Sequence, residues 1–190
     1  CMYVFGNGES RTSVNIDNLS GIKIGCNAIM RDYKMDHLIC VDRKMVREAI
    51  TTEYKSNIYT RENWIDEFHA YGIMSVPKLP YKGHERPDEP FQWGSGPYAV
   101  LLACQLSNDI KLIGFDLHSK DQYMNNIYKD TTNYNNSDHH YIDPRYWIHQ
   151  IGVLMMMYPS IKFKIYQTAH FKLPNNWKLP NVSVDTFDNL

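Results

Sequence analysis

Residues 2–10, with the sequence Met-Tyr-Val-Phe-Gly-Asn-Gly-Glu-Ser, decide the expected fold. The apolar run 2–5 stops at a glycine, which is the pattern of a strand that ends in a tight turn. The glycines of Gly6-Asn7-Gly8 let the backbone come close to a ligand and direct N–H groups at a phosphate, with Ser10 nearby. A plain tight turn has the same short pattern, so this loop predicts a nucleotide site only in combination with other signals.

Outward from this loop, apolar runs alternate with patterns of helical spacing. We expect strands at 2–5, 21–26, 37–41, 57–59, 111–115 and 161–166, and helices at 43–51, 61–71, 96–106 and 144–158. Such alternation predicts an α/β, Rossmann-like fold, in which a mostly parallel sheet carries helices on both faces. We place one nucleotide-binding domain at 1–169, followed by a tail at 170–190 that packs on it.

Composition limits the classes of partner. The chain has 190 residues and a net charge of −1, so no bulk attraction to nucleic acid or to an anionic membrane is expected. No apolar stretch is long enough to span a bilayer, and no signal peptide is visible. The four cysteines (Cys1, Cys26, Cys40 and Cys104) lack metal-ligand spacing. We therefore expect a cytoplasmic protein. Whether a homo-oligomer completes the site is left open.

A second glycine-flanked motif, Gly94-Ser95-Gly96, opens the helix expected at 96–106. A helix N-terminus is a favourable place for an anion, although a serine there can also act only as a helix cap. In parallel sheets, ligands bind beyond the carboxyl ends of the strands. The polar residues that follow strands are therefore further candidates, among them Asn27, Asp42 and Asp116.

Residues 117–141 are polar and show no periodicity, which is typical of a lid over a functional site. His118 follows Asp116 at the start of this segment, and Asp138, His140 and Tyr141 stand at its end. A histidine beside a carboxylate has the pKa range and the reach for general base catalysis. The alternative for the pair His139 and His140 is two solvated loop residues.

The set of motifs, in this order, resembles the bacterial sialyltransferases of glycosyltransferase family 42. It is also similar to the related Rossmann-like domains of flagellin-modifying glycosyltransferases and of the hydroxymethylpterin diphosphokinase-like group. The matching runs, which span roughly residues 2–166, are Gly6-Asn7-Gly8-Glu9-Ser10, Cys26-Asn27, Gly94-Ser95-Gly96-Pro97-Tyr98, Ile113-Gly114-Phe115-Asp116 and His140-Tyr141-Ile142.

The resemblance implies a nucleotide-sugar transferase that binds CMP between the glycine loop, the Ser95-Gly96 helix and the lid. It implies that the nucleotide is lined by Asn7, Asn27, Ser95, Gly96, Gly114 and Asp116, and that Tyr141 contacts the phosphate. The chain departs from the family pattern at four positions. Pro144 stands where the family has its catalytic histidine, Gln92 replaces an arginine, and His118 replaces a tyrosine. The second tyrosine of the lid has no exact match, although Tyr123 is near.

These observations lead to a glycosyltransferase-like function, in which a sugar passes from a CMP-sugar to a hydroxyl acceptor without a required metal or cofactor. His140 or His118 would act as the base, oriented by Asp138, and Tyr141 would stabilise the departing phosphate. Gly6, Gly8 and Ser10 would complete the nucleotide site. Two alternatives stay open. One is a non-catalytic protein that binds or sequesters a nucleotide, and the other is a phosphotransferase whose Mg²⁺ is held by Asp42 and Asp116.

Overall fold

The computed structural model describes residues 1–117, 126–129, 131 and 144–190, and it has an eight-stranded sheet with the order β5-β4-β3-β2-β1-β6-β7-β8. Every neighbouring pair of strands is parallel. The strands are β1 (Met2–Phe5), β2 (Ile22–Cys26), β3 (His37–Ile39), β4 (Asn57–Thr60), β5 (Met74–Ser75), β6 (Asp109–Ile113), β7 (Lys162–Gln167) and β8 (Val182–Thr186). The predicted α/β, Rossmann-like class is confirmed.

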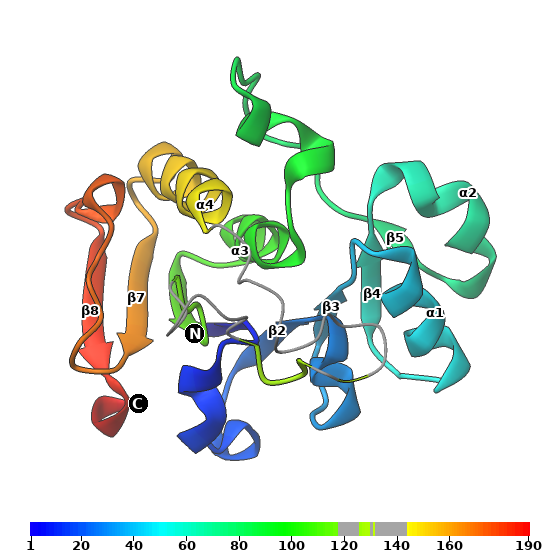
Figure 1. Cartoon of the computed structure of the whole chain (residues 1–190), viewed down its shortest axis with the longest axis horizontal. Helices are drawn as coiled ribbons and strands as arrows, with labels where there is room; N and C mark the ends of the chain where they lie inside the picture. Colours follow the sequence, from blue (N-terminus) through cyan, green and yellow to red (C-terminus); the bar gives the residue numbers. More distant parts are fainter. Residues whose placement is uncertain (118–125, 130, 132–143) are drawn as a thin grey trace.

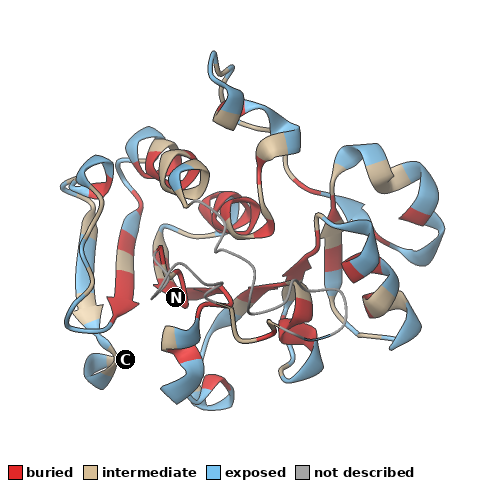
Figure 2. Cartoon of the chain, viewed as in Figure 1, coloured by how far each residue is buried: buried red, intermediate tan, exposed pale blue. Residues whose placement is uncertain are grey.

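The helices are α1 (Arg43–Thr51), α2 (Ile65–Phe68), α3 (Ser95–Leu106) and α4 (Arg145–Met157), with short 3-10 turns between other elements. Helices α3 and α4 cover one face of the sheet and pack on alternate strand residues such as Val4 and Leu112. Helix α1 lies over the opposite face, where Phe5 and Ile113 point. The central strands are therefore buried on both sides, as their near-continuous apolar sequence predicts (Figure 2).

The direction of strand addition reverses at β1. The chain adds β2 to β5 on one side of β1, returns through α3, and adds β6 to β8 on the other side (Figure 1). Val4 pairs with Ile24 of β2 and with Leu112 of β6. In open parallel sheets, the crevice at the carboxyl ends of such a switch point is the usual ligand site. Here that crevice lies between the loops that follow β1 and β6.

The segment 61–71 is not the single helix that its apolar spacing predicts. Two 3-10 turns flank the one-turn helix α2, and Gly72 ends the segment with a φ of 78°. A helix with suitable propensity and periodicity must still be stabilised by packing. In α2 only Phe68 is buried, so packing stabilises little more than one turn.

Strands β5 and β8 were missed by the sequence analysis. β8 lies in the expected tail and pairs with β7 from Val182 to Thr186, so part of this tail belongs to the sheet. Both are edge strands with largely exposed side chains, and exposed residues carry little of the apolar pattern that marks a strand. Trp177, which is fully buried, anchors the tail because its indole N–H donates to the Ile148 carbonyl at 2.8 Å.

Among the described residues, no helix has the length and apolar character needed to cross a membrane.

Candidate functional site

The glycine loop after β1 packs directly against the loop after β6. The Gly6 N–H donates to the Ile113 carbonyl at 2.8 Å, and the Gly8 N–H donates to the Gly114 carbonyl at 2.9 Å. A Cβ atom on Gly6 would lie 2.5 Å from the Gly114 oxygen, so no side chain fits there. Gly114 itself has a φ of 80°, a conformation that favours glycine. The glycines thus allow two loops to meet, and the N–H groups of Gly6 and Gly8 are already used.

Asp116 joins the same two loops through its carboxylate. One oxygen accepts from the Ser10 N–H at 2.8 Å, and the other accepts from the Ser10 hydroxyl at 2.5 Å and from the Gln167 amide at 2.7 Å. The sequence analysis assigned Ser10 and Asp116 to the nucleotide. The structure brings them together, but their recorded bonds are to each other and to β7, so they shape the wall of the site.

Arg11 is a buried residue of this region that the sequence analysis missed. It is 3% exposed, and its guanidinium donates to the Gly6 carbonyl at 2.9 Å and to the Asn7 side-chain oxygen at 3.1 Å. It also donates to the Tyr128 hydroxyl at 3.2 Å, which in turn donates to Asp32 at 2.8 Å. Arg11 follows the glycine loop by only three residues, but no spacing rule distinguishes a buried arginine from a solvated one.

The polar side chains at the ends of β1 and β2 form a connected line. The Asn7 amide donates to the Cys26 carbonyl at 2.9 Å, which fixes the glycine loop to β2. Asn27, with a φ of 53°, accepts from the Ser95 hydroxyl at 3.2 Å. That hydroxyl also accepts from the Val41 N–H at 3.1 Å. Asparagine tolerates this left-handed conformation better than most residues do, which explains its place at this turn.

These elements enclose a cavity of about 100 Å³ at the switch point. Eight of the predicted nucleotide-binding residues line it, namely Gly6, Asn7, Gly8, Asn27, Ser95, Gly96, Gly114 and Asp116. Trp147 and Ile151 of α4 close one side. Ser10, the remaining predicted residue, lies behind Asp116 and does not line the cavity.

The first turn of α3 supplies the donors of this cavity. Within the part of the chain that the structure describes, the N–H groups of Ser95 and Gly96 have no hydrogen-bond acceptor, whereas the Tyr98 N–H donates to the Gly94 carbonyl. Unpaired N–H groups and the helix dipole together give the start of a helix a positive potential. The cavity therefore suits an anionic group such as a phosphate.

The thiol that lines the cavity belongs to Cys26. Burial raises its pKa to about 12, an effect that the nearby Arg11 charge partly opposes. It stays protonated at neutral pH and is a poor nucleophile or metal ligand. Cys40 and Cys104 are also buried and unpaired by disulfides, as predicted. Over the described residues, no group of at least three His, Cys, Asp or Glu side chains is placed to hold a metal ion.

The predicted catalytic residues His118, Asp138, His140 and Tyr141 lie outside the described residues. Part of the predicted lid is described, and it contacts the glycine loop. The Ile127 N–H donates to the Asn7 carbonyl at 2.9 Å, and Lys129 pairs with Glu9 at 2.6 Å. Residues 126–129 therefore lie against the glycine loop of the switch-point site.

Comparison of the chain with protein-family models, curated proteins and solved structures finds no match. The functional argument therefore rests on the geometry of the site.

Proposed function

We propose that the protein binds the nucleotide of an activated sugar, a CMP-sugar, at the switch point and transfers the sugar to a hydroxyl acceptor. The observation that carries this proposal is the pair of unpartnered N–H groups at Ser95 and Gly96, which open into a cavity beside Asn27. A glycosyl phosphate leaving group gains negative charge as its bond to the sugar breaks. Donors that are fixed before the reaction stabilise that charge without reorganisation.

The size of the cavity indicates which part of the donor it would hold. Its volume of about 100 Å³ is the space of roughly three water molecules in the liquid. This is enough for a phosphate group and too little for a whole nucleotide, since small-molecule sites usually measure about 300–1,000 Å³. We therefore assign the phosphate to the cavity, with the ribose and the base extending along the carboxyl edge of the sheet past Asn27.

The proposed reaction is a displacement at the anomeric carbon. The acceptor oxygen forms a bond to this carbon while the bond from the carbon to the phosphate oxygen breaks, and CMP leaves with the bonding electrons. The acceptor proton passes to a base, for which His140 and His118 are the candidates from the sequence. The N–H groups of Ser95 and Gly96 would stabilise the departing phosphate, and the reaction requires no metal.

A protein that binds the nucleotide without turning it over is the second candidate. The observation that favours it is Pro144, which immediately precedes α4 and stands where the resembling family has its catalytic histidine. The magnesium-dependent alternative has less support. Asp42 caps the start of α1 and lines a different cavity from Asp116, so these two carboxylates do not face one another across one cavity.

A thermal-shift panel tests the proposal directly. CMP, CDP, UDP, GDP, ATP and CMP-sialic acid are added with and without Mg²⁺, because a ligand selective for the folded protein raises the melting temperature. We expect CMP and its sugar to raise it without Mg²⁺, and the backbone amide NMR signals of Ser95 and Gly96 to move. An unresponsive panel would mean that the glycine loops are structural turns only.

Asn27→Gly is the matched variant for this panel. Glycine adopts the φ of 53° at this position without strain, so only the side chain is lost. We expect the response to CMP to disappear, whereas the control Asn175→Ala, on the exposed turn before β8, keeps it. Turnover of CMP-sialic acid with simple galactosides then separates a transferase from a non-catalytic binder.

A further inference from the structure

A second, larger cavity lies further along the carboxyl edge of the sheet. Its volume is about 840 Å³, which is within the range of small-molecule sites. Its walls come from residues that follow β4, residues that follow β5, and the irregular segment 81–91 before α3. No strand or helix was predicted from the sequence for this segment, and no function was assigned to it.

Arg61 is the charged group of this cavity that lacks a counter-ion. It directly follows β4, and its guanidinium donates to the Trp93 carbonyl at 2.8 Å and stacks 4.6 Å from the centre of the Phe91 ring. Among the residues that the structure describes, its buried Nε–H has no acceptor and no carboxylate forms an ion pair with it. Burial lowers the arginine pKa, opposed in part by the charges of Tyr98 and Asp42. A buried donor left unpaired destabilises the protein, and a bound acceptor would remove that cost.

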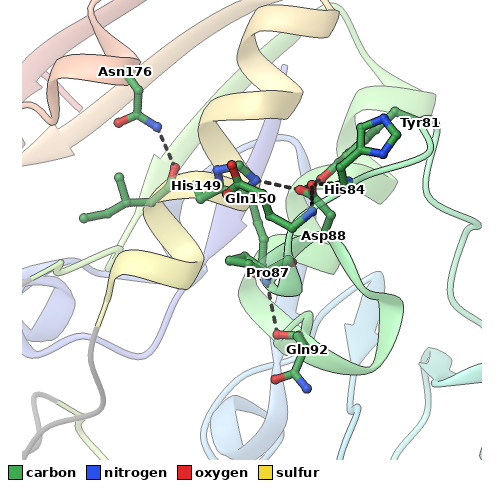
Figure 3. Close-up of polar contacts among 10 residues, drawn as sticks. Tyr81, His84, Pro87, Asp88, Gln92, His149, Gln150 and Asn176 are labelled. Carbon is green, nitrogen blue, oxygen red and sulfur yellow. Dashed lines mark hydrogen bonds and ion pairs between the residues drawn. The ribbon is translucent and has the colours of Figure 1, made fainter.

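The buried carboxylate of the cavity, Asp88, already has hydrogen-bond donors of its own. It accepts from His149 of α4 at 2.6 Å and from the Tyr81 hydroxyl at 2.9 Å (Figure 3). The N–H groups of His84 and Glu85 also donate to it, both at 3.2 Å. Asp88 therefore has little capacity left to pair with Arg61 or to bind a cation.

The remaining charged residues of the cavity lie at its rim. Glu62, Glu85, Glu89, Lys78 and Lys82 are all exposed, so solvent and salt screen their charges. Among the described lining residues, Arg61 thus supplies a buried donor that is still available to a ligand.

The rest of the lining is aromatic or apolar and is held in place before any ligand binds. Tyr81, Phe91 and Tyr98 contribute rings, and Leu79 adds an aliphatic surface. Gln150 of α4 fixes the segment 81–91 by donating to the Pro87 carbonyl at 2.8 Å and to the Gln92 carbonyl at 3.1 Å (Figure 3). A preformed cavity with rings and one directed cation recognises a ring-shaped ligand that carries an anionic group.

We propose that this cavity binds an organic oxyanion, a carboxylate or a phosphate attached to a ring, with the anionic group on Arg61 and the ring against Phe91 and Tyr98. Arg61 bonds to the carbonyl of Trp93. Ser95 of the switch-point cavity is two residues further along the chain, so the Cα atoms of Trp93 and Ser95 are at most about 7 Å apart. The ligand is thus placed to be the acidic acceptor of the sugar. This role as acceptor rests on the proposed function, whereas the binding itself does not.

Paired probes, one with and one without the anionic group, test the binding. 4-Nitrophenyl glucuronide is compared with 4-nitrophenyl glucoside, and phenyl phosphate with phenol, by calorimetric titration. We expect at least one acid to bind about tenfold or more tightly than its neutral partner, as one charged hydrogen bond predicts. The two pairs decide whether the site prefers a carboxylate or a phosphate. In the wild-type protein, the Arg61 Nε–H signal should move on addition of that acid.

Arg61→Gln should remove the preference for the acid. Arg86→Gln should retain it, because Arg86 is an exposed arginine of the segment 81–91 that does not line the cavity. Phe91→Ala, at a residue 55% exposed, tests the ring contact without altering the core and should weaken both members of a pair. The proposal is overturned if acids and neutral probes bind alike or not at all at millimolar concentration, or if Arg61→Gln keeps the preference. CMP added to the same samples and followed through the backbone amide NMR signals of Ser95 and Gly96 reports the switch-point site separately, so each site can fail alone.

Discussion

The two cavities on the carboxyl edge of the sheet differ in how their polar groups are satisfied. At the switch point, the side chains of Asn7, Arg11 and Asp116 bond to the protein itself, around a cavity of about 100 Å³. At the ends of β4 and β5, the cavity measures about 840 Å³ and a buried donor of Arg61 has no acceptor. At the switch point, these polar side chains join loops. At the ends of β4 and β5, one side-chain donor, the Arg61 Nε–H, stays available to a ligand.

This difference shows what a glycine motif does and does not indicate. Gly6, Gly8 and Gly114 are required because two backbones meet at van der Waals distance, whatever the site binds. The capacity to bind an anion at the switch point comes instead from the first turn of α3. Unpaired hydrogen-bond donors are therefore better evidence for a ligand than glycine motifs in the sequence are.

The largest expected effect contrasts Arg11, which is buried, with Arg61, which is half-buried. Arg11→Met would leave the Gly6 carbonyl, the Asn7 oxygen and the Tyr128 hydroxyl without their donor, so we expect a loss of about 3–5 kcal/mol in the free energy of unfolding. Arg61→Met removes one bond to Trp93 and should cost about 1 kcal/mol. Urea unfolding of both variants measures the two values, and equal losses would contradict the distinction between the regions.

Gly114→Ala should have the next largest effect. The new Cβ would lie 2.5 Å from the Gly6 oxygen, and the φ of 80° adds strain, so we expect a destabilisation of about 2–4 kcal/mol. Gly72→Ala is the control, because its φ of 78° is nearly the same and no atom lies within 4 Å of the new Cβ. It should cost about 1 kcal/mol, and the difference between the variants, measured by urea unfolding, isolates the contact between the loops.

Asp88→Asn should have the smallest effect, and one that depends on pH. Burial raises the pKa of Asp88, but hydrogen bonds from His149, Tyr81 and the Glu85 N–H outweigh this and hold the pKa below its ordinary value. A carboxyl group with a lowered pKa stabilises the folded state above the unfolded pKa of about 3.9, and this stabilisation is lost as the pH falls.

We therefore expect the variant to be about 1–3 kcal/mol less stable than the wild type at pH 7, with the gap closing below about pH 4. Asp17→Asn, at an exposed position, should change stability by less than about 0.5 kcal/mol at either pH. Thermal unfolding across this pH range measures both variants. A gap that stays constant with pH would show that the charge of Asp88 does not hold the segment 81–91 on α4.

The interior of the fold was predictable from the sequence, and its edges were not. β1, α1 and α3 were predicted within one residue, because buried elements repeat apolar residues at a regular spacing. β5 and β8 were missed because an edge strand exposes its side chains, and its pairing is made by backbone groups that every residue has. The helix expected at 61–71 was wrong because it buries too little to stabilise a regular helix.

At the candidate sites, the sequence predicted which loops form the site but not which side chains bond to one another. It placed Asn27, Ser95 and Asp116 at one edge from strand order alone, and the structure confirms that placement. It could not show that Asp116 bonds to Ser10, that Arg11 is buried, or that His149 pairs with Asp88. Arg61 has no sequence signal either, because a missing partner becomes visible only when the surrounding side chains are placed.

The parallel pairing of β1 with β6 also sets an order of events during synthesis. Met2 pairs with Ile110, so the central pair of the sheet cannot close until Ile110 has left the ribosome. At about 5–20 residues per second, β1 waits roughly 5–20 s for its partner. Until then, Val4 and Phe5 lack half of their final cover. The switch-point cavity, which needs both loops, is therefore among the last parts of the molecule to exist, and a nascent chain is exposed to aggregation or chaperone capture along this strand.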